Sequence, residues 1–296
     1  MSAGLLLGLG AALSWGLVDV CAAIAGRRVG SLKVLVGAQL ASVAVLVVVA
    51  LVAGKGLPTQ ANIIVTAIAA GLAAAGAYLS FFTALRIGPL SVVSPTVAAY
   101  GGLTVILAVI VRGEALTVHQ AIGAGISTVG VVLAGIVFEG GLRGTRLVSR
   151  GIGFAVMALV LFAVVTVGMA APIKSAGWLP VVLVSRLANA TAACSLLGVA
   201  LAGGSTRLRP FIDAAQAPTR IALGIVVLAG VLDVLGLISF AFGLEVAETW
   251  IVGLASSFGP AVAVLVGVAF LGERLRPTQW LGLGGIAAGL VVVAVS

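Results

Sequence analysis

Residues 113–125 read GEALTVHQAIGAG, and residues 272–284 read GERLRPTQWLGLG. The two stretches share the pattern G-E-x-L-x-x-x-Q-x-x-G-x-G, and both lie within apolar sequence long enough to cross a lipid bilayer. The repeat indicates that one membrane-embedded unit occurs twice in the chain. Internal repeats of membrane helices are typical of secondary transporters.

The composition excludes a soluble domain. Of the 296 residues, 62% are apolar and 8% are charged, whereas soluble domains carry about one quarter charged residues. The net charge of +8 comes from cations in short gaps between apolar runs. We therefore expect contact with the lipid bilayer and no nucleic-acid partner. Because Cys21 and Cys194 lie in apolar runs without metal-ligand spacing, the sequence predicts no metal site and no disulfide. Glycine pairs such as Gly8 and Gly10 lack the strand-turn-helix context of a nucleotide-binding loop, so no cofactor is expected.

The apolar segments predict an all-α integral membrane protein with ten transmembrane helices. A helix needs about 20 mostly apolar residues to cross the hydrocarbon, and the runs are too long and too uniformly apolar for barrel strands. The predicted spans lie near residues 4–26, 34–53, 61–85, 90–111, 118–138, 151–171, 179–202, 220–244, 248–271 and 278–295.

The ten spans divide into two predicted five-helix repeats, at residues 1–138 and 151–296, joined by a loop at 139–150. Tyr78 to Ile136 match Leu237 to Val295 at an offset of 159 residues, and the spans that precede the loop at 203–219 match their counterparts at an offset of 147. The loop at 203–219 absorbs the difference and has room for a short interfacial helix. Because five is an odd number, the second repeat is expected to lie upside down relative to the first.

The loop charges agree with an inverted arrangement. The loop with Arg27, Arg28 and Lys33 corresponds to a loop in the second repeat that carries Lys174 alone. Equivalent loops of an inverted repeat face opposite sides, and cytoplasmic loops are rich in Lys and Arg. This asymmetry predicts a multi-pass protein of the cytoplasmic membrane with both termini outside.

The second repeat carries a pattern that resembles a known family. Pro260 lies thirteen residues before Glu273, within Leu271-Gly272-Glu273-Arg274-Leu275, and Gln279-Trp280-Leu281-Gly282 begins the last span. Across essentially the whole chain, the sequence resembles the EamA-type family of the drug/metabolite transporter superfamily. The resemblance implies a ten-helix basket of two inverted halves that moves small organic metabolites or drugs across a prokaryotic cytoplasmic membrane. Its members usually keep both termini in the cytoplasm, opposite to the orientation from loop charges.

Three ionisable residues, Asp19, Arg186 and Asp233, fall in mid-span, where each charge costs about 2.5 to 3.5 kcal/mol on insertion scales. When the two repeats are aligned, polar residues occupy corresponding positions in the pairs Asp19/Thr166, Arg186/Gln39 and Asn189/Ser42. We expect these groups to line a shared cavity for a small organic solute between the two halves. Asp233 is the predicted proton site if transport is coupled to protons.

Aromatic and helix-breaking residues complete the predicted pathway. Trp15 lies one turn before Asp19, and Tyr78, Tyr100 and Ser256 are the other predicted contacts. Pro260 removes the helical hydrogen bond to the Ser256 carbonyl and kinks its span. Three residues at matching depth are therefore predicted to act as gates or hinges, namely Gly101, Gly102 and Pro260.

Each feature also has a purely structural interpretation. Arg186 could simply neutralise Asp19 or Asp233, and the aromatic rings could pack between helices. Glu114 and Glu273 are expected to accept backbone hydrogen bonds at the start of the last span of each repeat. Two glycine-rich faces are expected to pack closely, either within the chain or in a homodimer; they comprise Gly123, Ser127 and Gly130, and Gly282, Gly285 and Gly289.

The spans contain no catalytic constellation. The sole histidine, His119, lies at a span edge, and no His-Glu-x-x-His pattern occurs. We therefore expect a secondary carrier of small organic solutes that works by alternating access, and not an enzyme. A channel or facilitator, or a membrane sensor that transports nothing, is the alternative.

Overall fold

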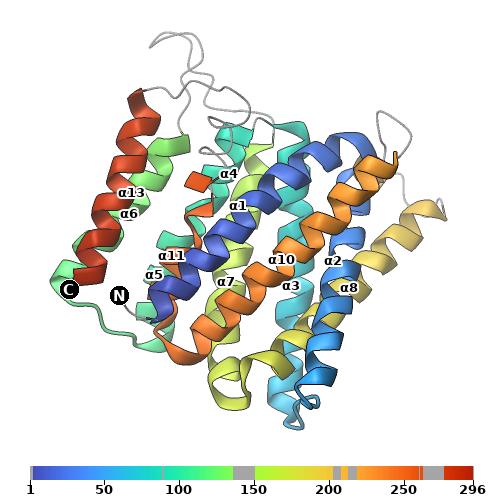
Figure 1. Cartoon of the computed structure of the whole chain (residues 1–296), viewed down its shortest axis with the longest axis horizontal. Coiled ribbons are helices and arrows are strands. Elements are labelled where there is room, and N and C mark those ends of the chain that lie inside the picture. The colour runs from blue at the N-terminus through green and yellow to red at the C-terminus, as the bar shows by residue number, and fades with distance from the viewer. Residues whose placement is uncertain are drawn as a thin grey trace.

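The computed structural model describes residues 3–88, 90–135, 151–202, 208–212, 219–259, 261–262 and 277–295. Within these ranges, every regular element is a helix (Figure 1). The helices of the first half are α1 (Ala3–Val29), α2 (Ser31–Val52), α3 (Ala61–Ile87), α4 (Leu90–Ala98), α5 (Tyr100–Arg112) and α6 (Val118–Gly135). Those of the second half are α7 (Ile152–Ala176), α8 (Trp178–Leu201), α9 (Arg209–Ile212), α10 (Arg220–Val246), α11 (Thr249–Ser256) and α13 (Pro277–Val295).

Six helices of the described chain, α1, α2, α3, α7, α8 and α10, are long and apolar enough to cross a membrane. They contain 22 to 27 residues, and at 1.5 Å per residue they extend over roughly 33 to 40 Å, which exceeds the roughly 30 Å of hydrocarbon. They form because their sequences are apolar on all sides, as in helices surrounded by lipid and other helices. Six of the predicted spans are therefore full-length helices, and the number ten stays a prediction.

The predicted span at 90–111 consists of two helices, α4 and α5, and its crossing of the membrane stays a prediction. Ala99 separates α4 from α5, although its φ of −60° and ψ of −7° stay in the right-handed helical region. Pro95 has no backbone N–H to complete the helical ladder, and Gly101 and Gly102 weaken the helix that follows. In the second half, α11 ends at Ser256, whereas Pro260 and the later part of the predicted span at 248–271 lie outside the described residues.

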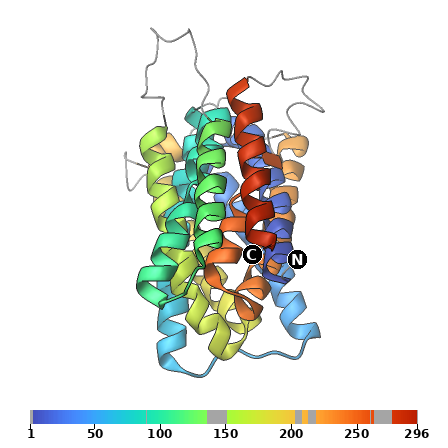
Figure 2. The ribbon, with the colours of Figure 1, turned by 90° about the vertical axis from the view of Figure 1, so that its left-hand side faces the viewer.

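Helices of the two halves pack against each other in corresponding pairs. Helix α1 packs along α10, and α3, the counterpart of α10, packs along α7, the counterpart of α1 (Figure 1). Helix α2 contacts α8, and α6 contacts α13. Both views place the two chain ends close together on one side of the molecule (Figures 1 and 2).

The glycine faces of α6 and α13 pack against each other. A Cβ atom on Gly123 would lie 2.9 Å from the Gly289 carbonyl oxygen, and one on Gly130 would lie 2.8 Å from that of Gly282. The two helices therefore run antiparallel, side by side in Figure 2. The prediction of close glycine packing is confirmed within the chain, and the homodimer stays a prediction.

Glu114 stabilises a different helix from the one predicted. Its carboxylate accepts hydrogen bonds from Arg112 Nε at 2.9 Å and from the backbone N–H of Trp250 at 3.1 Å, so it caps α11 of the second half. Helix α6 is capped instead by Thr117 and Gln120, which bond reciprocally through side chain and backbone in a capping box. Gly113, at φ 66°, turns the chain before Glu114. Glu273 lies outside the described residues.

Glu114→Gln is expected to lower the free energy of unfolding by about 1 kcal/mol at pH 7, the usual value of a helix cap. Burial acts to raise the pKa of Glu114, but hydrogen bonds from Thr249, Arg112 and Trp250 outweigh burial and lower it from 4.5. The stabilisation is therefore present above pH 4.5 and is lost as the pH falls through the lowered pKa. Denaturation in detergent at pH 7 and at acid pH measures the difference.

Glu248→Gln is the matched control, because Glu248 precedes α11 and makes no side-chain cap hydrogen bond. This variant should unfold like the wild type at both pH values. Equal stability of Glu114→Gln and wild type at pH 7 would contradict the proposed cap.

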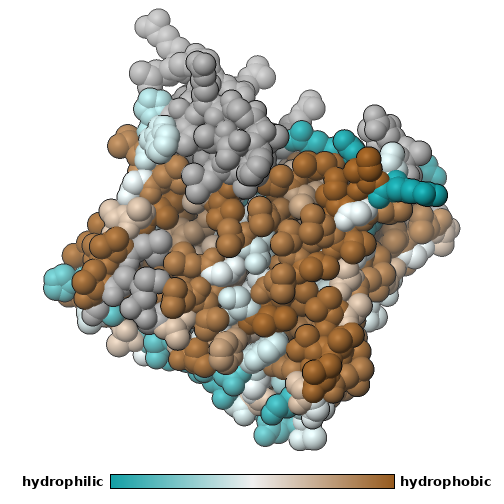
Figure 3. All heavy atoms as spheres, in the orientation of Figure 1, coloured by the Kyte–Doolittle hydropathy of each residue, from teal (hydrophilic) through white to brown (hydrophobic). Residues whose placement is uncertain are grey.

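The outer surface is apolar between two polar edges. Figure 3 shows hydrophobic atoms across the middle of the molecule, with hydrophilic atoms gathered near its upper and lower borders. Leu40, Val48, Ile68 and Leu228 are among the large side chains that are exposed on the spans. Such a large exposed apolar surface is compatible with lipid rather than water as the surrounding solvent.

The short helix predicted in the loop at 203–219 is confirmed as α9.

Candidate functional site

A cavity of about 140 Å³ lies between helices of both halves. Its walls come from α1, α3, α4 and α5 of the first half and from α7, α8, α10 and α11 of the second. Its volume is close to that of an engineered cavity of about 150 Å³ that binds benzene. The space is therefore suited to a small organic molecule.

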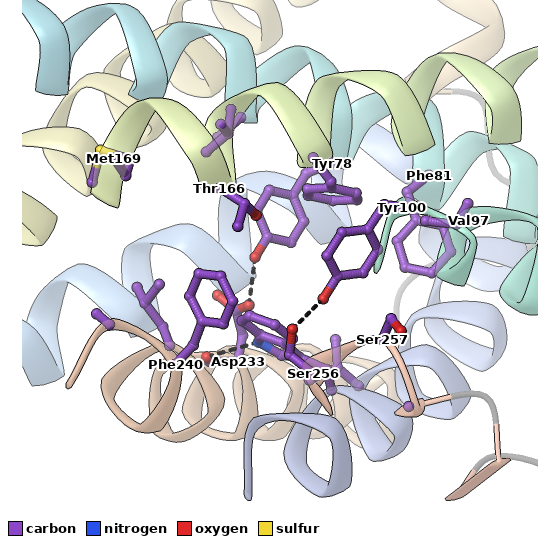
Figure 4. A pocket seen from close by; sticks show the side chains of 18 of the residues that line it. Tyr78, Phe81, Val97, Tyr100, Thr166, Met169, Asp233, Phe240, Ser256 and Ser257 are labelled. Carbon is purple, nitrogen blue, oxygen red and sulfur yellow. Dashed lines mark hydrogen bonds between the residues drawn. The ribbon is translucent and has the colours of Figure 1, made fainter. Parts of the chain in front are cut away.

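A buried ion pair lies on one side of the cavity. Arg186 Nη1 of α8 lies 2.9 Å from Asp233 Oδ2 of α10, and Tyr78 of α3 donates its hydroxyl to Asp233 Oδ1 at 2.8 Å (Figure 4). Arg186 also donates to the Tyr78 oxygen at 3.1 Å and to Gln39 Oε1 at 2.6 Å. The structure thus joins four of the predicted site residues in one network, with Gln39 supporting Arg186 from α2.

Asp19 of α1 lines the cavity but lies outside this network. It accepts a hydrogen bond from Ser94 Oγ of α4. Among the described residues, no cation is within ion-pair distance of Asp19, whereas Arg186 is paired with Asp233. Of the two structural interpretations of Arg186, neutralisation of Asp233 is therefore confirmed and neutralisation of Asp19 is wrong.

Aromatic side chains form another part of the wall. The rings lining the cavity belong to Trp15, Tyr78, Phe81, Phe82, Tyr100, Phe162 and Phe240. Phe162 is central, because its ring lies 5.1 Å from Tyr78, 6.2 Å from Phe81 and 6.1 Å from Tyr100. The Trp15 ring packs against Phe240 at a tilt of 50°, with the ring centroids 5.2 Å apart. Its indole N–H donates to the backbone carbonyl of Asp233 at 3.3 Å. Trp15 and Tyr78 therefore pack between helices and also face the cavity.

The two interrupted helices meet at the cavity. The Tyr100 hydroxyl and Ser256 Oγ are 2.7 Å apart (Figure 4), which joins the start of α5 to the end of α11. Gly101 faces the side chain of Ser257, and Gly102 faces Thr128 of α6, at distances that leave no room for a Cβ atom. Close helix approach accounts for both glycines, and their role as hinges stays a prediction.

Asn189 of α8 has an unusual position. It lines the cavity and is 1% exposed, yet neither its amide nitrogen nor its amide oxygen has a hydrogen-bond partner in the described structure. Buried polar atoms in proteins are nearly always paired. Asn189 is therefore available to donate to, and accept from, a bound solute.

The sequence profile of the EamA-like transporter family matches residues 2–136 and again residues 149–295. The chain belongs to the EamA-like transporter family. Membership makes it a multi-pass membrane protein of a family of transporters, and not of enzymes. Two separate matches also agree with the internal repeat of the sequence.

Similarity to solved structures gives the same fold for this EamA-like protein. Twenty-nine chains match, and one of them, described only as "Crystal structure of protein", is 19% identical with a TM-score of 0.78. That match covers 100% of this chain and 97% of the other. No protein of curated function matches the sequence.

Some residues of this EamA-like cavity were not predicted. Phe162 is the repeat counterpart of Trp15, and Phe81 and Phe240 are identical counterparts, so the repeat held a signal for all three. Ser94 had none, because its counterpart is Gly253. The described residues contain no group of three or more metal-ligating side chains.

Proposed function

We propose that this protein is a secondary transporter that carries small organic solutes across the cytoplasmic membrane by alternating access. Its ten spans would form two inverted five-helix halves, at residues 1–138 and 151–296, joined by 139–150. The cavity between the halves carries this proposal, since it has mostly apolar walls and a few polar groups that can orient a solute. Most of the predicted pathway residues line it.

Symmetric contacts support the inverted arrangement. Gly71 of α3 faces the backbone of Ser185 on α8, and Gly230 of α10 faces the backbone of Ala38 on α2. Gly230 is the counterpart of Gly71 at an offset of 159, and Ser185 is the counterpart of Ala38 at an offset of 147. Each contact is therefore repeated when the two halves are exchanged, as a pseudo-twofold axis requires. Antiparallel α6 and α13 agree with that axis.

The interrupted helices suggest where the transporter opens. Binding sites of many transporters lie beside discontinuous helices near the bilayer midplane, and here the break at Ala99 and the end of α11 both border the cavity. The contact between Tyr100 and Ser256 holds the two interruptions together. Entry of a solute into the cavity beside Tyr100 and Ser256 would require α5 and α11 to separate at this hydrogen bond.

Reconstitution tests the proposed function. Purified protein is screened for metabolites and drugs that raise its melting temperature, and each stabilising compound is tested for flux into proteoliposomes. We expect saturable flux that is absent from protein-free vesicles. Sustained ion current without saturation would indicate a channel instead, and binding without any flux would indicate a sensor. Labelling of single cysteines near each terminus with a membrane-impermeant reagent tests the proposed outside location of both ends.

Asp233→Asn is expected to abolish flux driven by a pH gradient if Asp233 carries a coupled proton. Protonation of Asp233 would release Arg186 from the ion pair at 2.9 Å and so would link proton binding to a rearrangement at the solute site. The measurement is flux into proteoliposomes with and without an imposed pH gradient. Glu248→Gln removes an acid outside the cavity and is the control. Unchanged pH dependence in Asp233→Asn would remove this role.

A further inference from the structure

Asp19 is an acidic side chain of the cavity that pairs with no cation among the described residues. Three charged residues are among the described residues that line the cavity, namely Asp19, Asp233 and Arg186, and Arg186 is paired with Asp233. Asp19 is 6% exposed and is held by the neutral hydroxyl of Ser94. A buried carboxylate is costly without a counter-charge. The site would therefore be stabilised by a positive charge beside Asp19.

The aromatic wall suits such a charge. Ring faces attract cations by about 0.5 to 2 kcal/mol, and Tyr100 lines the cavity together with Asp19. The face of Tyr78 is occupied by the Arg186 guanidinium, whose Cζ lies 5.2 Å from the ring centroid. The other six rings are not engaged by a cation among the described residues. Asn189 adds an unpaired amide oxygen that can accept from an N–H group.

We propose that the cavity binds a small monovalent organic cation with an apolar body, such as a substituted ammonium, with Asp19 as its counter-ion. The inference rests on the proposed function, because it takes the cavity as the solute site. A monocation would bring the cavity to neutrality, and its apolar substituents would contact the rings. An anion of the same shape would face an uncompensated carboxylate and be rejected.

Three probes of one shape test the charge preference. They are choline, its neutral analogue 3,3-dimethyl-1-butanol, and the anion 3,3-dimethylbutanoate. Calorimetric titration of the full-length protein in detergent at pH 7 should give a dissociation constant for choline at least ~10-fold lower than for the neutral alcohol. The anion should not bind. Equal binding of the cation and the alcohol, or no binding of choline, would overturn the proposal.

Asp19→Asn tests the counter-ion itself. The substitution keeps the side-chain shape, and it should remove the ~10-fold preference for choline over the alcohol. Glu248→Gln, which loses an exposed acid outside the cavity, should retain that preference. A cation preference that survives in Asp19→Asn would exclude Asp19 as the counter-ion. If Asp19→Asn does not fold, the three probes on the wild type still decide the charge preference.

Flux assays separate this inference from the proposed function. Binding of choline without flux into proteoliposomes would retain the cation site and contradict transport. Saturable flux of neutral or anionic solutes, with no flux or binding of choline, would retain transport and overturn the cation site. Flux of choline that falls in Asp19→Asn supports both.

Discussion

Arg186→Met is expected to destabilise the protein by about 3 to 5 kcal/mol, the cost of leaving one partner of a buried ion pair uncompensated. The side chains of Arg186 and Asp233 are 5% and 2% exposed, so bulk water solvates neither of them well when the other is removed. Tyr78 and Gln39 would also lose their contacts with the guanidinium. Equilibrium unfolding in mixed micelles measures the difference in free energy.

The double variant Arg186→Met/Asp233→Asn identifies the cause. It removes both charges, so it should be more stable than Arg186→Met alone, and a double-mutant cycle isolates the coupling. Lys55→Met removes a cation from an exposed loop position and should be close to the wild type. Wild-type stability of Arg186→Met would show that the ion pair contributes nothing to the fold.

Gly71→Ala and Gly230→Ala are expected to destabilise the protein by about 1 to 3 kcal/mol each, as overpacking usually does. A Cβ atom on Gly71 would overlap the Ser185 carbonyl oxygen, and one on Gly230 would lie 2.5 Å from that of Ala38. These backbone atoms cannot move without shifting a helix. Because the contacts are separate, the double variant should lose roughly the sum. Thermal unfolding in detergent measures each loss.

Two glycines on the same helices are matched controls. A Cβ atom on Gly76 of α3 would meet only Leu161 at 3.5 Å, and one on Gly224 of α10 would meet nothing within 4 Å. Gly76→Ala and Gly224→Ala should therefore be neutral, or stabilising by up to about 1 kcal/mol. Similar losses at all four positions would indicate a general effect of alanine and not helix contact. Loss at Gly71 but not at Gly230 would contradict the pseudo-twofold arrangement.

Much of the site was predictable because the internal repeat, and the depth of each residue within its membrane span, follow directly from the order of residues. Asp19, Arg186 and Asp233 are predictable as charges in mid-span, and all three line the cavity. Trp15, Tyr78, Tyr100, Asn189 and Ser256 were also predicted, and they line it as well. Ser94 was missed because a serine in an apolar span is common and its counterpart gave no signal.

The sequence by itself determined the helical membrane class, the internal repeat and the residues that lie at mid-depth. It could do so because lipid requires each span to satisfy its own backbone hydrogen bonds and to present apolar side chains, which are properties of local sequence. Only the tertiary structure decided that Arg186 pairs with Asp233 and that Asp19 accepts a hydrogen bond from Ser94. It also decided that α4 and α5 are separate helices and that Glu114 caps α11 and not α6. Those outcomes depend on distances between helices far apart in the chain, and residue order does not contain such distances.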